Sequence, residues 1–95
     1  MFILFYDYVP DVAERRGPHR AEHLALLEEL HEKGLVLMAG ALDDPLDMAV
    51  IVFTGTDREP VVRFVDSDPY VANGLVKEWR IRPWNVVVGR PEGVA

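Results

Sequence analysis

The stretch from residue 35 to residue 54, LVLMAGALDDPLDMAVIVFT, decides the fold of this 95-residue chain. It contains two apolar runs, residues 35–42 and 48–54, separated by the turn-forming sequence Asp43-Asp44-Pro45. Short apolar runs bounded by turn residues are typical of strands. Two adjacent strands with a short link predict an antiparallel hairpin in the middle of the chain.

The first predicted helix precedes this hairpin and covers residues 17–33. It begins at Gly17-Pro18, because proline is favoured in a first helical turn, and it ends before Gly34, which adopts the left-handed conformation at low steric cost. At about 100° per residue, its leucines gather on one side and most of its glutamates on the other. His23 falls near the middle of the leucine side, which contains Leu24, Leu26, Leu27 and Leu30.

The second predicted helix follows the hairpin. Thr56 and Glu59 have the spacing of a capping box, in which two side chains satisfy free backbone N–H groups at the start of a helix, and Pro60 follows in the first turn. We expect the helix to end near Ser67, because the residue before a proline avoids helical angles. Asp66 and Ser67 are expected to face solvent at this frayed end.

Two further strands surround these elements. Residues 2–9 are a run of aromatic and β-branched residues, and residues 76–88 form the last strand, with Pro83 as a bend or edge position. Trp79 and Trp84 on this strand are expected in the core or in a dimer interface.

The predicted order β-α-β-β-α-β is that of a ferredoxin-like α+β fold, with a four-stranded antiparallel sheet and two helices on one face. The strands at residues 2–9 and 48–54 are apolar on both faces, so the second face needs a cover. Another copy of the same sheet is the simplest cover. We therefore expect a homodimer that packs through its sheet faces around a barrel-like core.

Composition excludes several classes of function. We expect one domain over residues 1–90 and a tail over residues 91–95. The net charge is −6, from 10 basic and 16 acidic residues with no stripe of Lys or Arg, which argues against nucleic acid as a partner. The chain has no cysteine, so disulfides, thiolate metal sites and a cysteine nucleophile are excluded. The apolar start MFILFYDY is too short to span a membrane, and we expect a cytoplasmic protein.

His23 and Asp68 are the candidate catalytic residues. An imidazole on the sheet-facing side of a helix needs a hydrogen-bond partner, and a core histidine bonded to a backbone carbonyl is one interpretation. In the other interpretation, the Asp68 carboxylate orients the ring for proton transfer. Asp68 precedes Pro69 and is also a typical N-cap for a short turn over residues 69–73, closed by Gly74. One carboxylate oxygen can accept the capping N–H while the other reaches the imidazole.

Two residues near this pair each have two interpretations, and two histidines have the spacing of metal ligands. Tyr70 either donates its hydroxyl to a ligand or packs its ring over the end of the sheet. Arg20, three residues before His23, either holds an anionic substrate or pairs with a glutamate. His19 and His23 have the i, i+4 spacing of two metal ligands, but no third ligand follows at a recognisable spacing, so we expect no metal site.

Three stretches carry further information: HRAEHLALLEELHEKG at residues 19–34, the Ala39-Gly40 end of the second strand, and DSDPYVANGLVKEWRIRPWNVV at residues 66–88. Together they resemble the YciI-like (YCII-related) family of the dimeric α+β barrel superfamily. The third stretch is the most specific, since Asp-Pro-Tyr followed by a glycine-containing turn and an Ile-x-Pro-Trp strand is not a generic pattern. The chain departs from the family at Ala41, where relatives carry proline, and in its short loop at residues 43–47.

The resemblance implies a ferredoxin-like protomer, dimerisation through the sheets, and a cleft between sheet and helices holding a histidine and an aspartate, which map to His23 and Asp68. The sequence leaves assembly into a higher oligomer open. Arg20, Tyr70 and Gly40 are the candidate ligand-binding residues. Relatives include an enzyme that acts on a chlorinated aromatic ring compound.

Family membership does not assign an activity, so two functions stay open. The first is an enzyme that needs no cofactor and carries out isomerisation or elimination by proton transfer on a small organic, ring-containing substrate. The second is a non-catalytic ligand-binding or accessory module. In a third interpretation, His23 and Asp68 only stabilise the fold.

Overall fold

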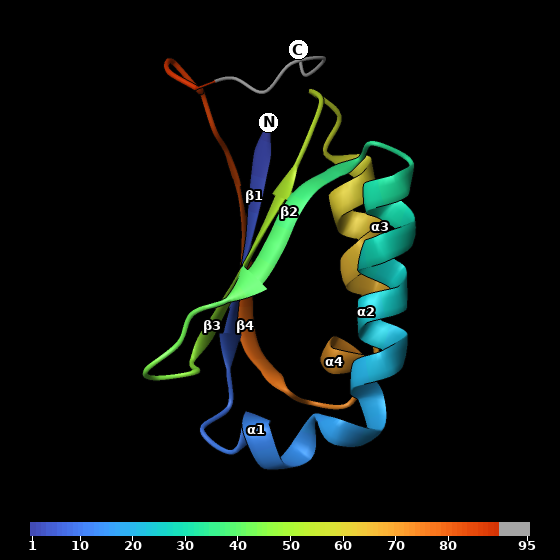
Figure 1. Ribbon diagram of the computed structural model, residues 1–95, viewed down its shortest axis with the longest axis vertical. Helices are drawn as coiled ribbons and strands as arrows, with labels where there is room; N and C mark the ends of the chain where they lie inside the picture. Colours follow the sequence, from blue (N-terminus) through green and yellow to red (C-terminus); the bar gives the residue numbers. More distant parts are fainter. Residues whose placement is uncertain (90–95) are drawn as a thin grey trace.

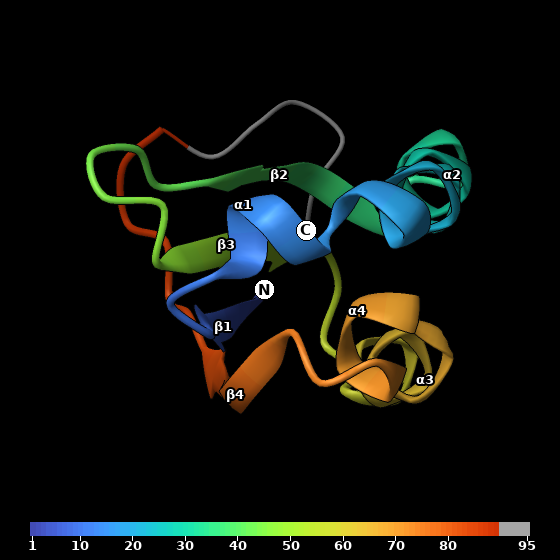
Figure 2. The same cartoon turned by 90° about the horizontal axis from the view of Figure 1, so that it is seen from below.

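The sheet forms one layer of the molecule and the helices form the other (Figures 1 and 2). The computed structural model describes residues 1–89, so the tail predicted over residues 91–95 lies outside the described residues. The strands β1 (Phe2–Tyr8), β2 (Val36–Ala41), β3 (Met48–Phe53) and β4 (Val76–Pro83) form an antiparallel sheet in the order β2-β3-β1-β4. This is the ferredoxin-like α+β fold that the sequence predicts.

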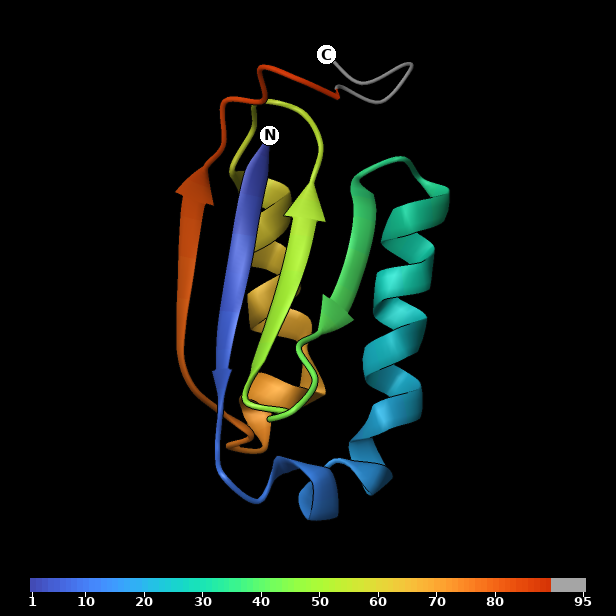
Figure 3. The ribbon, with the colours of Figure 1, turned by 60° about the vertical axis from the view of Figure 1, so that its left-hand side comes forward.

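The helices lie on one side of the sheet. The long helix α2 (Gly17–Glu32) runs beside the edge strand β2, and α3 (Glu59–Ser67) lies behind the central strands (Figure 3). Two single-turn helices, α1 (Val12–Arg15) and α4 (Pro69–Ala72), lie at the same end of the molecule. The elements predicted from the sequence leave residues 10–16, where α1 forms, outside any helix or strand. Val12 explains the difference, because its side chain is buried in the core and holds this turn against the protein.

The start of α3 differs from the predicted capping box. The N-cap residue is Arg58, which forms no side-chain capping bond. The backbone N–H of Glu59 instead donates to Oδ1 of Asp57 at 3.0 Å. Asp57 thus takes the N–H-accepting role that the pattern assigned to Thr56, because an Asx side chain readily accepts from a backbone N–H two residues further on.

The last strand is shorter than predicted. β4 ends at Pro83 instead of continuing to residue 88, since proline has no N–H to donate to a sheet ladder. One more backbone bond follows, from the Trp84 N–H to the carbonyl oxygen of Met1 at 2.8 Å. Trp79 and Trp84 keep 41% and 45% of their surface exposed, so neither belongs to the core of a single chain, and their place in a dimer interface stays a prediction.

The two faces of the sheet have different surroundings. Side chains on the inner face, among them Leu4, Tyr6 and Ile51, form the core with residues of α2 and α3. On the outer face, the strand register places Phe5 of β1 opposite Val50 of β3, and the pair Ile3–Val52 continues the apolar surface. The same face is charged along β4, where Arg80 lies over the Phe5 ring. Within residues 1–89, no helix covers this outer face (Figure 2).

Candidate functional site

Asp68 lies at the junction of two helices and is completely buried. α3 ends at Ser67, and the extended backbone of Asp68 (φ −76°, ψ 120°) is the conformation expected for a residue before proline. Pro69 begins α4, and Oδ1 of Asp68 accepts the Tyr70 N–H at 3.1 Å as its N-cap. The Asp-Pro sequence therefore turns the chain and points a carboxylate into the protein interior, with Asp66 and Ser67 facing solvent.

Three donors converge on this carboxylate. Nδ1 of His23 lies 2.8 Å from Oδ1, and the Tyr6 hydroxyl donates to Oδ2 at 2.8 Å. The N–H of Tyr70 is the third donor. Oδ1 therefore serves both the imidazole and the helix cap, whereas the sequence predicted one oxygen for each. Oδ2 is occupied by Tyr6, which the sequence analysis did not single out.

The hydrogen bonds define the state of the His23 ring. Its partner is the Asp68 carboxylate and not a backbone carbonyl, and a carboxylate only accepts, so we assign the proton to Nδ1. Nε2 is then the acceptor of the neutral ring. Within residues 1–89 no buried side-chain nitrogen or oxygen lacks a partner, and Nε2 forms no hydrogen bond there. Nε2 is therefore accessible from outside the core, although His23 as a whole is only 5% exposed.

Aromatic packing fixes the orientation of the imidazole. The rings of His23 and Tyr70 stack with centroids 3.7 Å apart and an interplanar angle of 4°. Tyr8 contacts the Tyr70 ring with its edge, at a centroid distance of 6.1 Å. Tyr70 is 2% exposed, and its ring packs between those of His23 and Tyr8. The hydrogen bond to Asp68 and the stacking contact together leave the His23 ring little freedom to rotate.

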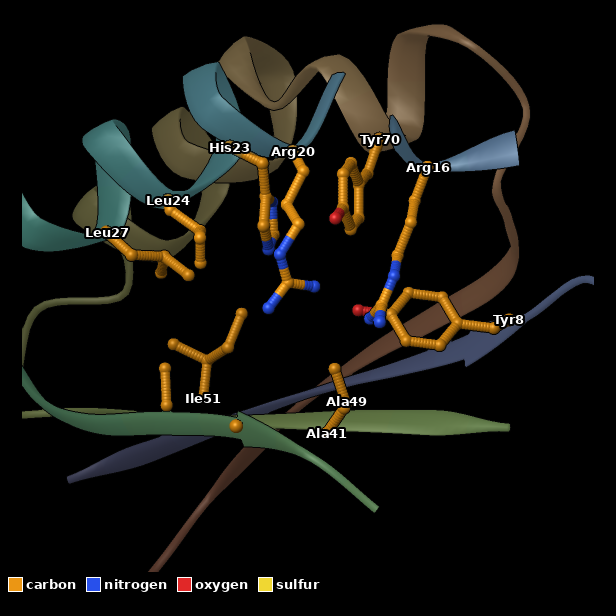
Figure 4. A pocket seen from close by; sticks show the side chains of 12 residues that line it. Tyr8, Arg16, Arg20, His23, Leu24, Leu27, Ala41, Ala49, Ile51 and Tyr70 are labelled. Carbon is orange, nitrogen blue, oxygen red and sulfur yellow. The ribbon is translucent and has the colours of Figure 1, made fainter. Parts of the chain in front are cut away.

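A cavity of about 220 Å³ lies between the first half of α2 and the sheet (Figure 4). One side of it is polar and one side is apolar. The polar side chains are Tyr8, Arg16, Arg20, His23 and Tyr70; the apolar ones are Leu24, Leu27, Ala49 and Ile51; and β2 adds Ala39, Gly40 and Ala41. Of the five predicted site residues, four thus line one cavity, and Asp68 lies behind His23.

Gly40 contributes to the cavity through its backbone. It is paired with Val50, a position on the outer face of the sheet, so a side chain at residue 40 would point away from the helices. A Cβ built there meets no atom within 4 Å. Ala41 points toward the cavity instead (Figure 4).

The tyrosines of this region stay protonated at neutral pH. Burial raises the pKa of Tyr6 far above its ordinary value, and the adjacent Asp68 carboxylate raises it further. Burial also raises the pKa of Tyr8 and Tyr70, although the guanidinium groups of Arg16 and Arg20 act in the opposite direction. All three hydroxyls can therefore act as hydrogen-bond donors.

Three residues of the site were missed by sequence reasoning: Tyr6, Tyr8 and Arg16. Both tyrosines share a strand face with Leu4, and a hydroxyl on a buried face needs a partner, which is a signal that could have found them. Arg16 precedes Arg20 by four residues, so the two side chains lie near each other at the start of the helix.

The described residues were also compared with what a metal site and a membrane-spanning helix require. Among residues 1–89, no group of three or more His, Asp or Glu side chains is placed to hold a metal ion. None of the helices in the described part of the chain is both long and apolar enough to cross a bilayer.

Comparison with known proteins gives related sequences over nearly the whole chain. A model of the YCII-related domain matches residues 1–85. Protein YciI of Escherichia coli O6:H1 and protein YciI of Shigella flexneri are each 30% identical over 96 residues, covering 92% of this chain and 98% of theirs. An uncharacterized protein of Haemophilus influenzae is 27% identical and covers 90% of this chain and 97% of its own.

A solved structure shares the fold. It is 5-chloro-2-hydroxyhydroquinone dehydrochlorinase (TftG) from Burkholderia phenoliruptrix AC1100, in complex with 2,5-dihydroxybenzoquinone. Its TM-score is 0.72, and the match covers 90% of this chain and 94% of that chain at 24% sequence identity. An identity this low supports the architecture alone. The sequence match over residues 1–85 is the stronger finding, and by it the chain belongs to the YCII-related domain family.

Proposed function

We propose that the protein is an enzyme that transfers a proton on a small ring substrate, with Nε2 of His23 as its acid–base group. The observation that carries this proposal is the buried 2.8 Å bond between Nδ1 of His23 and Asp68, in a histidine that also lines a cavity. Asp68 holds the tautomer in which Nε2 accepts, and its carboxylate stabilises the imidazolium that forms when Nε2 takes a proton. Asp68 is in this account a positioning residue.

The proposed chemistry needs only a proton acceptor that can return its proton. Nε2 takes a proton from a carbon beside a carbonyl group, the C–H electron pair forms a carbon–carbon double bond, and the carbonyl π pair moves to oxygen as an enolate. In an isomerisation, the imidazolium gives the proton back at another ring carbon. In an elimination, the enolate oxygen pair re-forms the carbonyl, the C=C pair shifts to make a double bond to the neighbouring carbon, and the leaving group departs from that carbon as an anion with its bonding pair. The imidazolium then releases its proton to water.

The cavity fits one ring. An engineered apolar cavity of roughly 150 Å³ holds benzene, so about 220 Å³ admits a six-membered ring with small substituents. The apolar side of the cavity offers a surface for the ring, and the polar side offers groups for its substituents. The structural neighbour holds a compound of this kind, 2,5-dihydroxybenzoquinone.

The molecule that acts is, in this proposal, a dimer of sheets packed through their outer faces. Ile3 and Phe5 of β1 lie beside Val50 and Val52 of β3 on this face, and Met38 of β2 is 62% exposed there. A contiguous apolar surface of this kind marks an interaction site. The antiparallel sheet leaves it available because the helices occupy the other side (Figure 1).

Deuterium exchange tests the proton transfer directly. The probe is 2,5-dihydroxybenzoquinone in D₂O: a ring carbon of its enolate takes up a deuteron, and Nε2 removes the proton from the resulting sp³ carbon beside the carbonyl. Loss of the ring protons is followed by NMR. We expect the protein to accelerate exchange over buffer, and His23→Gln to lower the accelerated rate by about a hundredfold, the order of a general acid–base contribution. His19→Gln, one turn away on the same helix and outside the cavity lining, is the matched control and should exchange like the native protein.

Two results would count against the proposal. Equal acceleration by the native protein and by His23→Gln would exclude Nε2 as the acid–base group. Binding of the probe without any acceleration, seen as a thermal shift alone, would favour the ligand-binding module over the enzyme.

A further inference from the structure

The polar end of the cavity carries a local excess of positive charge. Arg16 and Arg20 extend from the start of α2 into the space between the helices and the sheet (Figure 4). None of the twelve residues that line the cavity is an aspartate or a glutamate, although the whole chain has 16 acidic and only 10 basic residues. The charge at this end is thus opposite in sign to the charge of the molecule.

Neither of these arginines is neutralised by a carboxylate within residues 1–89. The ion pairs of Arg and Lys in this part of the chain use Arg15, Lys33, Arg63 and Arg80. The pairing with a glutamate considered for Arg20 is therefore not formed. Arg16 is half-buried and Arg20 is exposed, so both guanidinium groups can bind an added anion without first breaking an ion pair with a carboxylate.

Two hydroxyl donors lie at the same end. Tyr8 and Tyr70 line the cavity, and the charges of Arg16 and Arg20 act on both. Because burial keeps the pKa of both phenols raised, their hydroxyls remain protonated and can donate to an oxygen anion. The guanidinium groups and the neutral hydroxyls are all hydrogen-bond donors, and no carboxylate in the cavity lining competes for them.

We infer that the ligand of this cavity is an anionic ring compound whose negatively charged oxygen is bound by Arg16 and Arg20, while its ring lies against Leu24, Leu27 and Ile51. The inference names the substrate class of the proposed proton transfer and rests on it for the position of the reacting carbon. Arg20 precedes His23 by three residues on α2, so an oxygen held by Arg20 brings the ring next to the imidazole. A neutral compound of the same shape lacks this attachment.

Benzoate and benzamide test the charge requirement without any reaction, because they share a ring and differ in charge. We expect the native protein to bind benzoate at least about tenfold more tightly than benzamide, by NMR titration. Arg16→Gln and Arg20→Gln should each weaken benzoate binding by about tenfold, the effect of losing one hydrogen bond to a charged group, with benzamide unchanged. Added NaCl should weaken benzoate binding alone.

Arg63→Gln is the matched control, since it removes the same charge from an exposed position on α3 outside this cavity. Repeating the titration with 2,5-dihydroxybenzoquinone distinguishes an enolate oxygen from a carboxylate. Equal binding of benzoate and benzamide, no benzoate binding in the millimolar range, or equal losses in all three arginine variants would overturn the inference.

The outcome separates this inference from the proposed function. If His23→Gln keeps the preference for benzoate and no variant changes deuterium exchange, the anion site stands and the enzyme proposal fails. If the exchange depends on His23 but benzoate and benzamide bind alike, the enzyme stands and the anion site is wrong.

Discussion

At the scale of single residues, the site depends on one buried carboxylate that accepts three hydrogen bonds. Asp68 accepts from His23, Tyr6 and the Tyr70 N–H without any exposure to water. Each donor restricts the carboxylate in a different direction, so the imidazole meets a partner with one orientation. The sequence indicated His23 and Asp68 because of their places on the helix and before proline. It did not indicate that Tyr6 pairs with Asp68, because a hydroxyl on a buried strand face predicts a partner but not which one, and Asp68 is 62 residues away.

The hydroxyl of Tyr6 should be visible in the pH dependence of stability. Its folded pKa is raised above the ordinary value of about 10. Above about pH 10 the unfolded chain loses this proton and the folded chain keeps it. The free energy of unfolding therefore falls as the pH rises further, by up to about 1.4 kcal/mol per pH unit for each such tyrosine. Tyr6→Phe should make the fall in the free energy of unfolding between about pH 10 and 11 less steep.

Tyr8→Phe is the comparison for this experiment, since burial raises the pKa of Tyr8 in the same direction. Both substitutions should reduce the alkaline slope, but only Tyr6→Phe removes a hydrogen bond to Asp68. At pH 7, Tyr6→Phe should therefore cost about 1–3 kcal/mol of stability and Tyr8→Phe less. Urea unfolding at fixed pH measures both quantities, and an unchanged alkaline slope in Tyr6→Phe would contradict the expectation.

At the scale of elements, the turn between α3 and α4 is the device that places the carboxylate. The Asp-Pro pair ends α3 and caps α4. The sequence predicted this helix end, because proline restricts the backbone of the residue before it. The sequence did not predict which residue caps the start of α3, since Asp57 and Thr56 can both accept from backbone N–H groups there. α1 was missed because a single turn has no periodicity and is held by the burial of Val12, a tertiary contact.

Pro69 and Pro60 offer a matched pair for testing this turn, since both lie in the first turn of a helix. Pro69→Ala and Pro60→Ala should each lose about 0.4–1 kcal/mol of stability through the greater freedom of the unfolded chain, with an additional loss at Pro69 because it is buried. Only Pro69→Ala should disturb the proton on Nδ1 of His23, which ¹⁵N NMR of the imidazole reports. An undisturbed tautomer in Pro69→Ala would show that the helix cap alone suffices to place Asp68.

At the scale of the whole molecule, the outer face of the sheet is the feature that the sequence described best. Alternation in the strands at residues 2–9 and 48–54 predicted apolar residues on both faces, and the register places them there. The cavity was not predictable in the same way. Its size depends on how far α2 lies from β2 and β3, and this distance is set by packing across the whole core and not by any local pattern.

A charge in the centre of the outer face should separate the proposed dimer. Val50 pairs with Phe5 on one side and Gly40 on the other. Val50→Lys would bury an unpaired ammonium group between two sheets, so we expect sedimentation to show a dimer for the native protein and a monomer for the variant at micromolar concentration. Ala25→Lys, on the exposed side of α2, should remain dimeric. Sedimentation of the native protein as a monomer would contradict the proposed interface.

The hydrogen bonds of Asp68 join parts of the chain that are far apart in sequence. Its partners His23 and Tyr6 are 45 and 62 residues away, on α2 and on β1. Forming such long-range contacts costs the entropy of closing large loops. The hydrogen-bonded cluster around Asp68 therefore forms only when the first strand, the long helix and the turn before the last helix have all reached their native positions.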